Sequence, residues 1–230
     1  MLFDQGHGQQ FLIENNGPLD LSIFAGMFRD QNFEIRTSTG PFTKETLANV
    51  STVIISGPFK PITVPEIVAL QEFLNEGGQL SIMLHIGSPA AQLLSSLGVA
   101  ISNGVIQEQK NLLADAPPTD FIVKELASSH PLTKELTEVK FYGAWALNTQ
   151  LEANVIAKTS PTAWIDLNDN GTLETNDAVQ PFSVIITGQL GHGHFIVFAD
   201  DAIFQNSFIT EQNKVLAANL AAWLKQGSYY

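Results

Sequence analysis

Cysteine is absent from this chain. Without a thiol, the protein can form no disulfide bond, no thiolate zinc site and no cysteine nucleophile. Cysteine-free proteins occur in reducing and in oxidising compartments, so the absence does not indicate where the chain works. It does remove every cysteine-dependent class of enzyme from consideration.

Basic residues are scarce as well. The chain has 11 Lys and Arg residues against 23 Asp and Glu residues, which gives a net charge of −12. This charge repels phosphate backbones and anionic lipid, so we expect no nucleic-acid partner. No apolar run approaches the roughly 18 residues of a membrane span, and the amino terminus lacks a basic region followed by an apolar stretch. The sequence therefore predicts a soluble protein without membrane insertion, cytoplasmic as given and extracytoplasmic if a signal peptide has been trimmed.

The chain does contain enough apolar residues for one large core. Its composition is 44% hydrophobic and 15% charged, and no low-complexity linker divides its 230 residues. A chain of this length and composition can bury a single full core. We therefore expect one domain over residues 1–230.

The first hundred residues alternate strand patterns with helix patterns. Strands are expected at 1–4, 33–37, 51–56 and 79–84, and helices at 18–28, 64–75 and 90–97. We interpret the order as an alternation of strands and helices with short connections. Such an order is typical of an α/β fold with a parallel sheet covered by helices on both faces.

The second half of the chain is less regular. Residues 99–160 carry short apolar runs separated by proline and glycine, which predicts an irregular, strand-rich excursion. Two strands at 182–187 and 195–199 follow, joined as a hairpin through the glycine-bearing connection at 188–193. A helix closes the chain, with apolar residues at helical spacing between 215 and 224.

Ligands of an open parallel sheet bind beyond the carboxyl ends of its strands, because loops and helix amino termini converge there. Polar residues and glycines follow four of the predicted strands in this chain. The candidate ligand-binding residues are Asp4, His7, Gly8, Gln9, Gly57, His85, Asp200 and Asp201. We expect them to line one strand-end cleft.

Two interpretations of these residues stay open. Asp4 and Asp200 can cap a following turn through their side-chain oxygens, and His85 can be a hydrogen-bonded packing residue. His7 lies between two glycines and follows an acid, which favours a position facing the cleft. A neighbouring acid fixes the tautomer of a histidine and raises its pKa for acid and base catalysis, but a structural hydrogen bond uses the same pair.

The sharpest local motif runs from Asp166 to Asp177. Oxygen-bearing residues occupy positions 1, 3, 5, 9 and 12 of this twelve-residue loop and glycine occupies position 6, as in calcium loops except for the final aspartate in place of glutamate. The candidate metal ligands are Asp166, Asn168, Asn170, Thr172 through its carbonyl, Glu174 and Asp177. The motif predicts a structural Ca²⁺ site, and an Asn- and Asp-rich turn that needs no ion is the alternative. No organic cofactor is predicted.

Four stretches of the sequence together resemble the class I glutamine amidotransferase-like superfamily. They are Leu2 to Gln9, Gly77 to Leu80, Leu94 to Val99 and Gly191 to Asp201. More narrowly, they resemble its branch related to the accessory domains of gliding-motility ABC transporters and to an intraflagellar-transport subunit. The resemblance implies a single amidotransferase-like domain with a flavodoxin-like, mostly parallel sheet and helices on both faces.

Glutamine hydrolysis by that superfamily's route is excluded, because the matching turn at His85 to Ser88 carries no cysteine. The first remaining hypothesis, which we favour, is a non-catalytic domain that binds a small polar ligand, a glycan or a protein partner in the cleft. The second is a hydrolase in which His7 acts with Asp4 or Asp200 as acid and base, with or without a metal. A perturbed pKa of His7 in a cleft would favour the enzyme, and a solvated His7 would favour binding.

Overall fold

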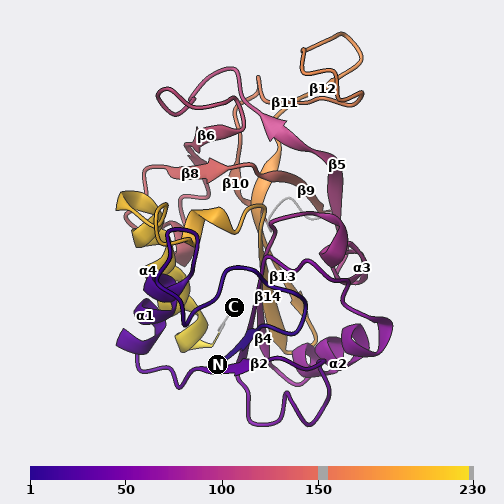
Figure 1. Cartoon of the computed structure of the whole chain (residues 1–230), viewed down its shortest axis with the longest axis vertical. Coiled ribbons are helices and arrows are strands. Elements are labelled where there is room, and N and C mark those ends of the chain that lie inside the picture. Colours follow the sequence, from indigo (N-terminus) through magenta and orange to yellow (C-terminus); the bar gives the residue numbers. More distant parts are fainter. Residues whose placement is uncertain (150–154, 228–230) are drawn as a thin grey trace.

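The computed structural model describes residues 1–149 and 155–227, without the side chains of Ser88 and Gln226. One mixed β-sheet runs through the molecule between two layers of helices (Figure 1). The helices are α1 (Ser22–Asp30), α2 (Val64–Asn75), α3 (Ala91–Ser96) and α4 (Glu211–Gln226).

One half of the main sheet is parallel. In spatial order its strands are β2 (Arg36–Ser38), β1 (Leu2–Asp4), β3 (Thr52–Ser56), β4 (Gln79–Met83) and β14 (Gly193–Phe198). Each strand pairs in parallel with its neighbours in this order. The carboxyl ends of the five strands therefore lie along one edge of the sheet, as the sequence predicted.

The other half of the main sheet is antiparallel. It continues from β14 through β13 (Ser183–Leu190), β9 (Trp145–Thr149), β5 (Val99–Gln107), β11 (Trp164–Ile165) and β12 (Ala178–Val179). The α/β class that the sequence predicts is therefore confirmed, but the sheet is mixed, whereas the prediction was a mostly parallel sheet. Between β5 and β13 the described residues form no α-helix that could serve as a crossover, and parallel neighbours usually need one.

Residues 99–160 are more regular than the predicted irregular excursion. β5 and β9 extend the main sheet, while β6 (Asp120–Val123) and β8 (Val139–Tyr142) form a separate two-stranded sheet. β7 (Glu125–Leu126) pairs with β10 (Val155–Lys158), which in turn pairs with β13. Residues 150–154 of the predicted excursion lie outside the described residues.

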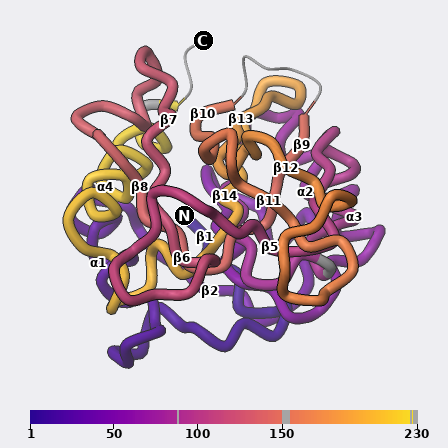
Figure 2. Tube along the Cα trace, turned by 90° about the horizontal axis from the view of Figure 1, so that it is seen from above, coloured from indigo at the N-terminus to yellow at the C-terminus, as the bar shows by residue number. Residues whose placement is uncertain are grey.

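Helices cover both faces of the sheet. α1 and α4 lie on one face and α2 and α3 on the other, in the side view and in the view from above (Figures 1 and 2). On the first face, Phe3 of β1 packs edge-on against Phe24 and Phe28 of α1, with 6.2 and 6.0 Å between ring centroids. No helix in the described part of the chain combines the length and the apolar character that crossing a membrane requires.

Two connections differ from the prediction. Residues 39–51, between β2 and β3, form turns and no helix, so the strict alternation of strands and helices fails there. Thr43 and Thr46 each accept the backbone N–H of the other, which gives this backbone an alternative to helical hydrogen bonds. The hairpin connection predicted over 188–193 is a two-residue turn that begins at Gly191, where φ is +59°.

Candidate functional site

The strand ends bring the candidate residues together in two clusters instead of one. The first, the His7 cluster, lies at the end of β1 and comprises Asp4, His7, Gly8 and Gln9 together with Glu66. The second, the His85 site, lies at the ends of β3, β4 and β14 and comprises Gly57, His85, Asp200 and Asp201 with the rings of Phe11 and Phe59. The two clusters have different chemical environments.

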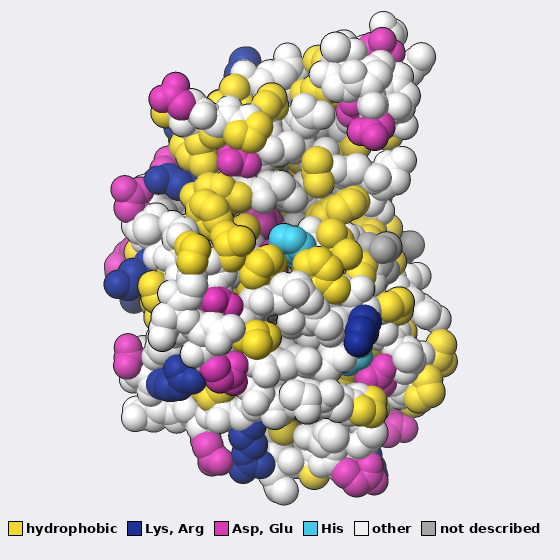
Figure 3. Space-filling model, viewed as in Figure 1, with side chains coloured by type: hydrophobic (Ala, Val, Ile, Leu, Met, Phe, Trp, Pro, Cys, Tyr) yellow, Lys and Arg dark blue, Asp and Glu magenta, His cyan; other side chains and the backbone are white. Residues whose placement is uncertain are grey.

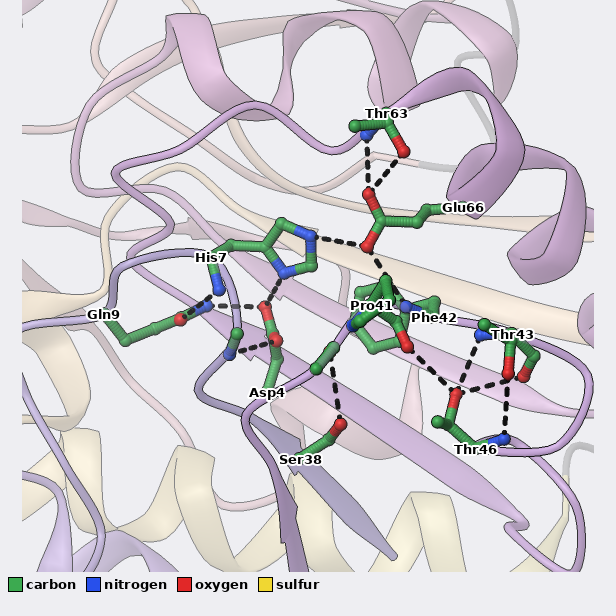
Figure 4. A network of polar contacts seen from close by, with 12 residues as sticks. Asp4, His7, Gln9, Ser38, Pro41, Phe42, Thr43, Thr46, Thr63 and Glu66 are labelled. Carbon is green, nitrogen blue, oxygen red and sulfur yellow. Dashed lines mark hydrogen bonds and ion pairs between the residues drawn. The ribbon is translucent and has the colours of Figure 1, made fainter.

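The His7 imidazole lies between two carboxylates (Figure 4). Its Nδ1 donates to Asp4 Oδ2 at 2.8 Å, and its Nε2 donates to Glu66 Oε1 at 2.9 Å. Gln9 Nε2 also donates to Asp4 Oδ2, at 2.5 Å, and the Phe42 ring stacks on the imidazole with 5.1 Å between centroids. Only 4% of His7 is exposed. Both ring nitrogens are therefore used inside the protein.

Glu66 is a residue that the sequence analysis misses. It lies in the first turn of α2, where the backbone N and Oγ1 of Thr63 donate to its Oε2 at 2.9 and 2.6 Å. The Phe42 N–H donates to Glu66 Oε1 at 3.1 Å. Thr63 and Glu66 form the capping box of the helix. The Thr-x-x-Glu spacing indicates a helix start, but no sequence signal places that start beside His7.

The two carboxylate partners fix the charge of His7. An ionised carboxylate only accepts hydrogen bonds, so both ring nitrogens carry protons, as in an imidazolium. Burial alone would lower the pKa of His7, but the hydrogen bond and charge of Asp4 together with Glu66 raise it overall. Burial acts to raise the pKa of Glu66, but the hydrogen bonds from Thr63 and Phe42 and the charge of His7 lower it overall. The cluster is a buried ion triad.

His7 offers no free nitrogen to a substrate in this arrangement. The hydrolase hypothesis requires one beside Asp4 or Asp200, and Asp200 belongs to the other site. The geometry fits the structural interpretation of Asp4, whose Oδ1 accepts the Gly6 N–H at 3.0 Å and caps the turn after β1. His7 therefore has a raised pKa and a buried structural role. The enzyme hypothesis expected a perturbed pKa in a cleft and the binding hypothesis expected a solvated His7, so neither describes this combination.

Gly8 and Gln9 support the loop that carries His7. Gln9 Oε1 accepts the His7 N–H at 2.9 Å. Gly8 has φ of +75°, and a Cβ there would lie 3.2 Å from a side-chain carbon of Lys60. The His7 carbonyl accepts the N–H groups of Phe59 and Lys60 at 2.9 and 2.8 Å, so the loop after β1 is tied to the loop after β3.

His85 follows β4 and reaches the surface. Its Nδ1 donates to Asp201 Oδ1 at 2.9 Å, and its side chain is 34% exposed. The rings of Phe11 and Phe59 lie 5.1 and 5.2 Å from the imidazole, centroid to centroid. Trp145 Nε1 donates to the His85 carbonyl at 3.2 Å. Figure 3 shows a histidine near the middle of one face with hydrophobic side chains gathered around it.

Two buried aspartates follow β14 at the same site. Asp200 accepts the N–H groups of Tyr142 and Ala202 at 2.7 and 2.8 Å, so it caps a turn as the structural interpretation requires. Asp201 is fully buried, and its Oδ2 has no hydrogen-bond partner among the described residues. A Cβ on Gly57 would meet this oxygen at 2.3 Å. Gly57 therefore leaves the space that Asp201 occupies.

The pKa values of several ionisable groups at the His85 site are raised. The hydrogen bond with Asp201 is the largest influence on His85, whose pKa is raised. Burial raises the pKa of Asp201 and raises that of Asp200 well above its usual value. Burial and then the charge of Asp200 raise the pKa of Tyr142 to about 12. The raised pKa of His85 favours its protonated form hydrogen-bonded to Asp201, whereas burial acts against the ionised form of Asp201.

The predicted calcium loop connects β11 to β12. Asp166 Oδ2 accepts the Gly171 N–H at 2.6 Å, and this is the first of several backbone hydrogen bonds that lower the pKa of Asp166. Asp177 accepts the N–H groups of Leu167 and Glu174 at 3.0 and 2.7 Å. Within the described chain, no three or more His, Cys, Asp or Glu side chains are grouped as a metal site requires. The loop closes through its own hydrogen bonds, and Ca²⁺ binding stays a prediction.

Several solved structures share this fold. The N-terminal domain of mmIFT52 is 16% identical with a TM-score of 0.78, over 100% of this chain and 99% of that one. A putative ThuA-like protein from Bacteroides uniformis ATCC 8492 is 13% identical with a TM-score of 0.56, over 97% of this chain and 89% of that one. A β-galactosidase from Bacillus circulans sp. alkalophilus is 13% identical with a TM-score of 0.54, over 93% of this chain and 29% of the enzyme.

These likenesses concern the fold alone. They agree with the predicted resemblance to an amidotransferase-like domain and to an intraflagellar-transport subunit, while the narrower relation to gliding-motility transporters stays a prediction. A search of curated proteins finds no match to the sequence. The family model described as "Domain of unknown function (DUF4350)" matches residues 13–224, which is nearly the whole chain. The chain therefore belongs to the DUF4350 family.

Proposed function

We propose that this chain is a non-catalytic binding domain that holds a small polar ligand, a glycan or a segment of a protein partner at the His85 site. One observation carries the proposal: the His85 imidazole is 34% exposed at the carboxyl ends of β3, β4 and β14 while Asp201 fixes its orientation. Parallel sheets bind ligands at this edge. Apolar walls with a few oriented polar groups, here Phe11 and Phe59 around His85, are typical of ligand sites.

The serine that ends β3 is buried, which supports a binding role over a catalytic one. The chain has no cysteine, and Ser56 at the end of β3 is only 6% exposed. A covalent nucleophile must reach its substrate and lie beside a base that activates it. The His7 nitrogens are both bonded to carboxylates, and Asp200 accepts two backbone N–H groups. These groups hold the fold in place and leave the His85 edge for recognition.

Binding at the His85 site is tested by NMR titration with a panel of monosaccharides, amino acids and short peptides. A ligand of this site should shift the amide signals of Gly57, His85 and Asp201. We expect the substitution His85→Gln to weaken the affinity at least about tenfold, because it removes a hydrogen bond to a charged group. The matched control is His192→Gln, an exposed histidine on the β13 to β14 turn, which should leave the affinity unchanged. Shifts confined to another face would contradict the proposal.

We also propose that the loop from Asp166 to Asp177 binds Ca²⁺ as a structural ion. The spacing of its oxygen ligands supports this, as does the Gly171 N–H that donates to Asp166. Saturating Ca²⁺ should raise the melting temperature by about 5 °C over that in EDTA. Asp177→Asn should abolish the rise, whereas Asp169→Asn should keep it, because it removes the same charge from a position that supplies no ligand. Equal melting temperatures of the wild type in Ca²⁺ and in EDTA would refute the site.

A further inference from the structure

The exposed edge of His85 is the one that carries Nε2. Nδ1 faces Asp201, which is fully buried, so the part of the ring that reaches solvent is the opposite edge. Among the described side chains, none hydrogen-bonds to Nε2. Nε2 is therefore the atom of the imidazole that can form a hydrogen bond with a ligand at the His85 site.

The position of the proton between His85 and Asp201 decides whether Nε2 is a charged hydrogen-bond donor. Asp201 Oδ1 accepts from His85, whereas Asp201 Oδ2 is buried, lies against Gly57 and has no hydrogen-bond partner in the described part of the chain. A proton placed on Oδ2 would have no acceptor, and an unmade buried hydrogen bond is costly. In the ion pair the protonated imidazole donates from Nδ1 to Asp201 and keeps a second N–H at Nε2, and the hydrogen bond and charge of Asp201 favour this form because they raise the pKa of His85. Nε2 is then a donor that carries positive charge.

Among the described residues, no lysine or arginine forms an ion pair with the acids beside His85. The groups that surround it are Asp200 and Asp201 after β14, Trp145 from β9, and Phe11 and Phe59 from the loops after β1 and β3, while Tyr142 from β8 contacts Asp200. Lys60 follows Phe59 in the chain, but its side chain lies over Gly8 in the His7 cluster. None of the described ion pairs joins a lysine or arginine to Asp200 or Asp201. His85 is thus the cation that a ligand would meet at this site.

The aromatic rings beside His85 indicate which chemical group a ligand would carry next to its hydrogen-bond acceptor. Phe11 meets the imidazole edge-on and Phe59 lies tilted to it, both with centroids within 5.2 Å. A donor among such rings is partly shielded from water, so a hydrogen bond from its charged form gains strength. The rings themselves favour contact with a flat apolar group. An acceptor joined to an apolar body fits both features.

We propose that the His85 site binds a carboxylate carried on a flat apolar group, such as an aromatic carboxylic acid, through a hydrogen bond from His85 Nε2. The inference rests on the proposed binding function and names the ligand class of that same site. Free anions without an apolar body, such as acetate, bind more weakly because they gain nothing from Phe11 and Phe59. The overall charge of −12 acts against every anion, but at physiological salt its effect is screened beyond about 8 Å and the near groups decide.

The test compares phenylacetate with phenylacetamide, its neutral counterpart of nearly the same shape. Affinities are measured by NMR titration, with the ring signals of His85 followed directly. At about pH 6 phenylacetate should bind at least about tenfold more tightly than phenylacetamide, because it accepts from a charged donor. As the pH rises through the pKa of His85, the affinity for phenylacetate should fall at least about tenfold and that for phenylacetamide should stay constant.

Two variants separate the parts of the inference. His85→Gln should abolish the pH dependence, and an unchanged melting curve shows that it folds. Phe59→Leu should weaken both probes equally and keep the pH dependence, which covers the case in which His85→Gln fails to fold. Equal affinity for phenylacetate and phenylacetamide would overturn the carboxylate inference and leave the binding proposal standing. The same conclusion would follow if a ligand of the panel bound at His85 and neither probe did. If the panel and the probes all fail to shift His85, both proposals fall.

Discussion

Replacing His7 by glutamine is expected to destabilise the protein by about 3–5 kcal/mol. The substitution removes the positive charge between Asp4 and Glu66, whose side chains are 0% and 6% exposed. Two buried carboxylates would then face a neutral amide, and breaking a buried ion pair costs far more than losing an exposed one. Urea unfolding at neutral pH measures the loss, and the melting temperature should fall by about 10 °C.

A triple variant distinguishes lost charge from lost packing. Asp4→Asn, Glu66→Gln and His7→Gln together keep the size of every side chain and leave no unpaired charge, so the triple variant should be more stable than His7→Gln alone. His192→Gln serves as the control for replacing a histidine, because His192 is exposed on a turn. If His7→Gln unfolds at the same urea concentration as the wild type, the buried triad contributes no stability and the interpretation is wrong.

The contribution of His7 should also depend on pH within a definite window. The pKa of His7 is raised, so its stabilisation is full below the unfolded value of about 6.5 and is lost as the pH rises through the folded value. The pKa of Glu66 is lowered, so its stabilisation is full above its unfolded value and is lost as the pH falls through the folded one. The difference in unfolding free energy between the wild type and His7→Gln should be largest between these limits.

Local patterns predict the elements that local interactions determine. The bounds of α2, Val64–Asn75, agree with the sequence prediction at both ends. A capping box of Thr63 and Glu66 begins this helix, and Gly77, with φ of +99°, follows its end. β3 and β4 agree within one residue, because their apolar runs are short and end at polar residues or glycine.

Contacts between distant residues are what the sequence does not reveal. The pattern of an acid and a glycine-flanked histidine at Asp4 and His7 is the same for a catalytic and a structural pair. What decides is Glu66, which is 59 residues from His7 along the chain and contacts it only after β1 and α2 have packed. The β13 to β14 hairpin is confirmed, but the other antiparallel pairings are not predicted, because apolar periodicity marks a strand and does not identify its partner.

The His85 site is predicted by a general rule about parallel sheets and not by a local sequence motif. His85 and Asp201 are 116 residues apart in the chain, and no motif connects them. They were expected near one another because β4 and β14 were predicted to end at the same edge of a parallel sheet, and these two strands do pair in parallel. The rule does not predict which of the strand-end residues make contact. That depends on side-chain packing, and at this site it depends on one glycine.

Replacing Gly57 by alanine is expected to cost about 3 kcal/mol and to separate His85 from Asp201. Gly57 has φ of +54°, where a Cβ costs roughly 1–2 kcal/mol. The new Cβ would also lie 2.3 Å from Asp201 Oδ2 and 3.3 Å from His85 Cβ, and overpacking a buried site costs about 1–3 kcal/mol more. The carboxylate must move, so the pKa of His85 should fall toward its ordinary value, since the hydrogen bond to Asp201 is the largest influence that raises it. Urea unfolding and NMR titration of His85 measure the two effects.

Gly98→Ala is the matched control for this prediction. Gly98 has φ of +75°, but no atom lies within 4 Å of the place that its Cβ would occupy, so the substitution strains the backbone without a clash. It should cost about 1–2 kcal/mol and leave the pKa of His85 unchanged. The difference between the two variants then measures the contact between Gly57 and Asp201. If both lose the same stability and His85 titrates identically in both, Asp201 has room to move. Its unpaired oxygen would then be free to find a partner, and the argument that the shared proton resides on His85 would lose its support.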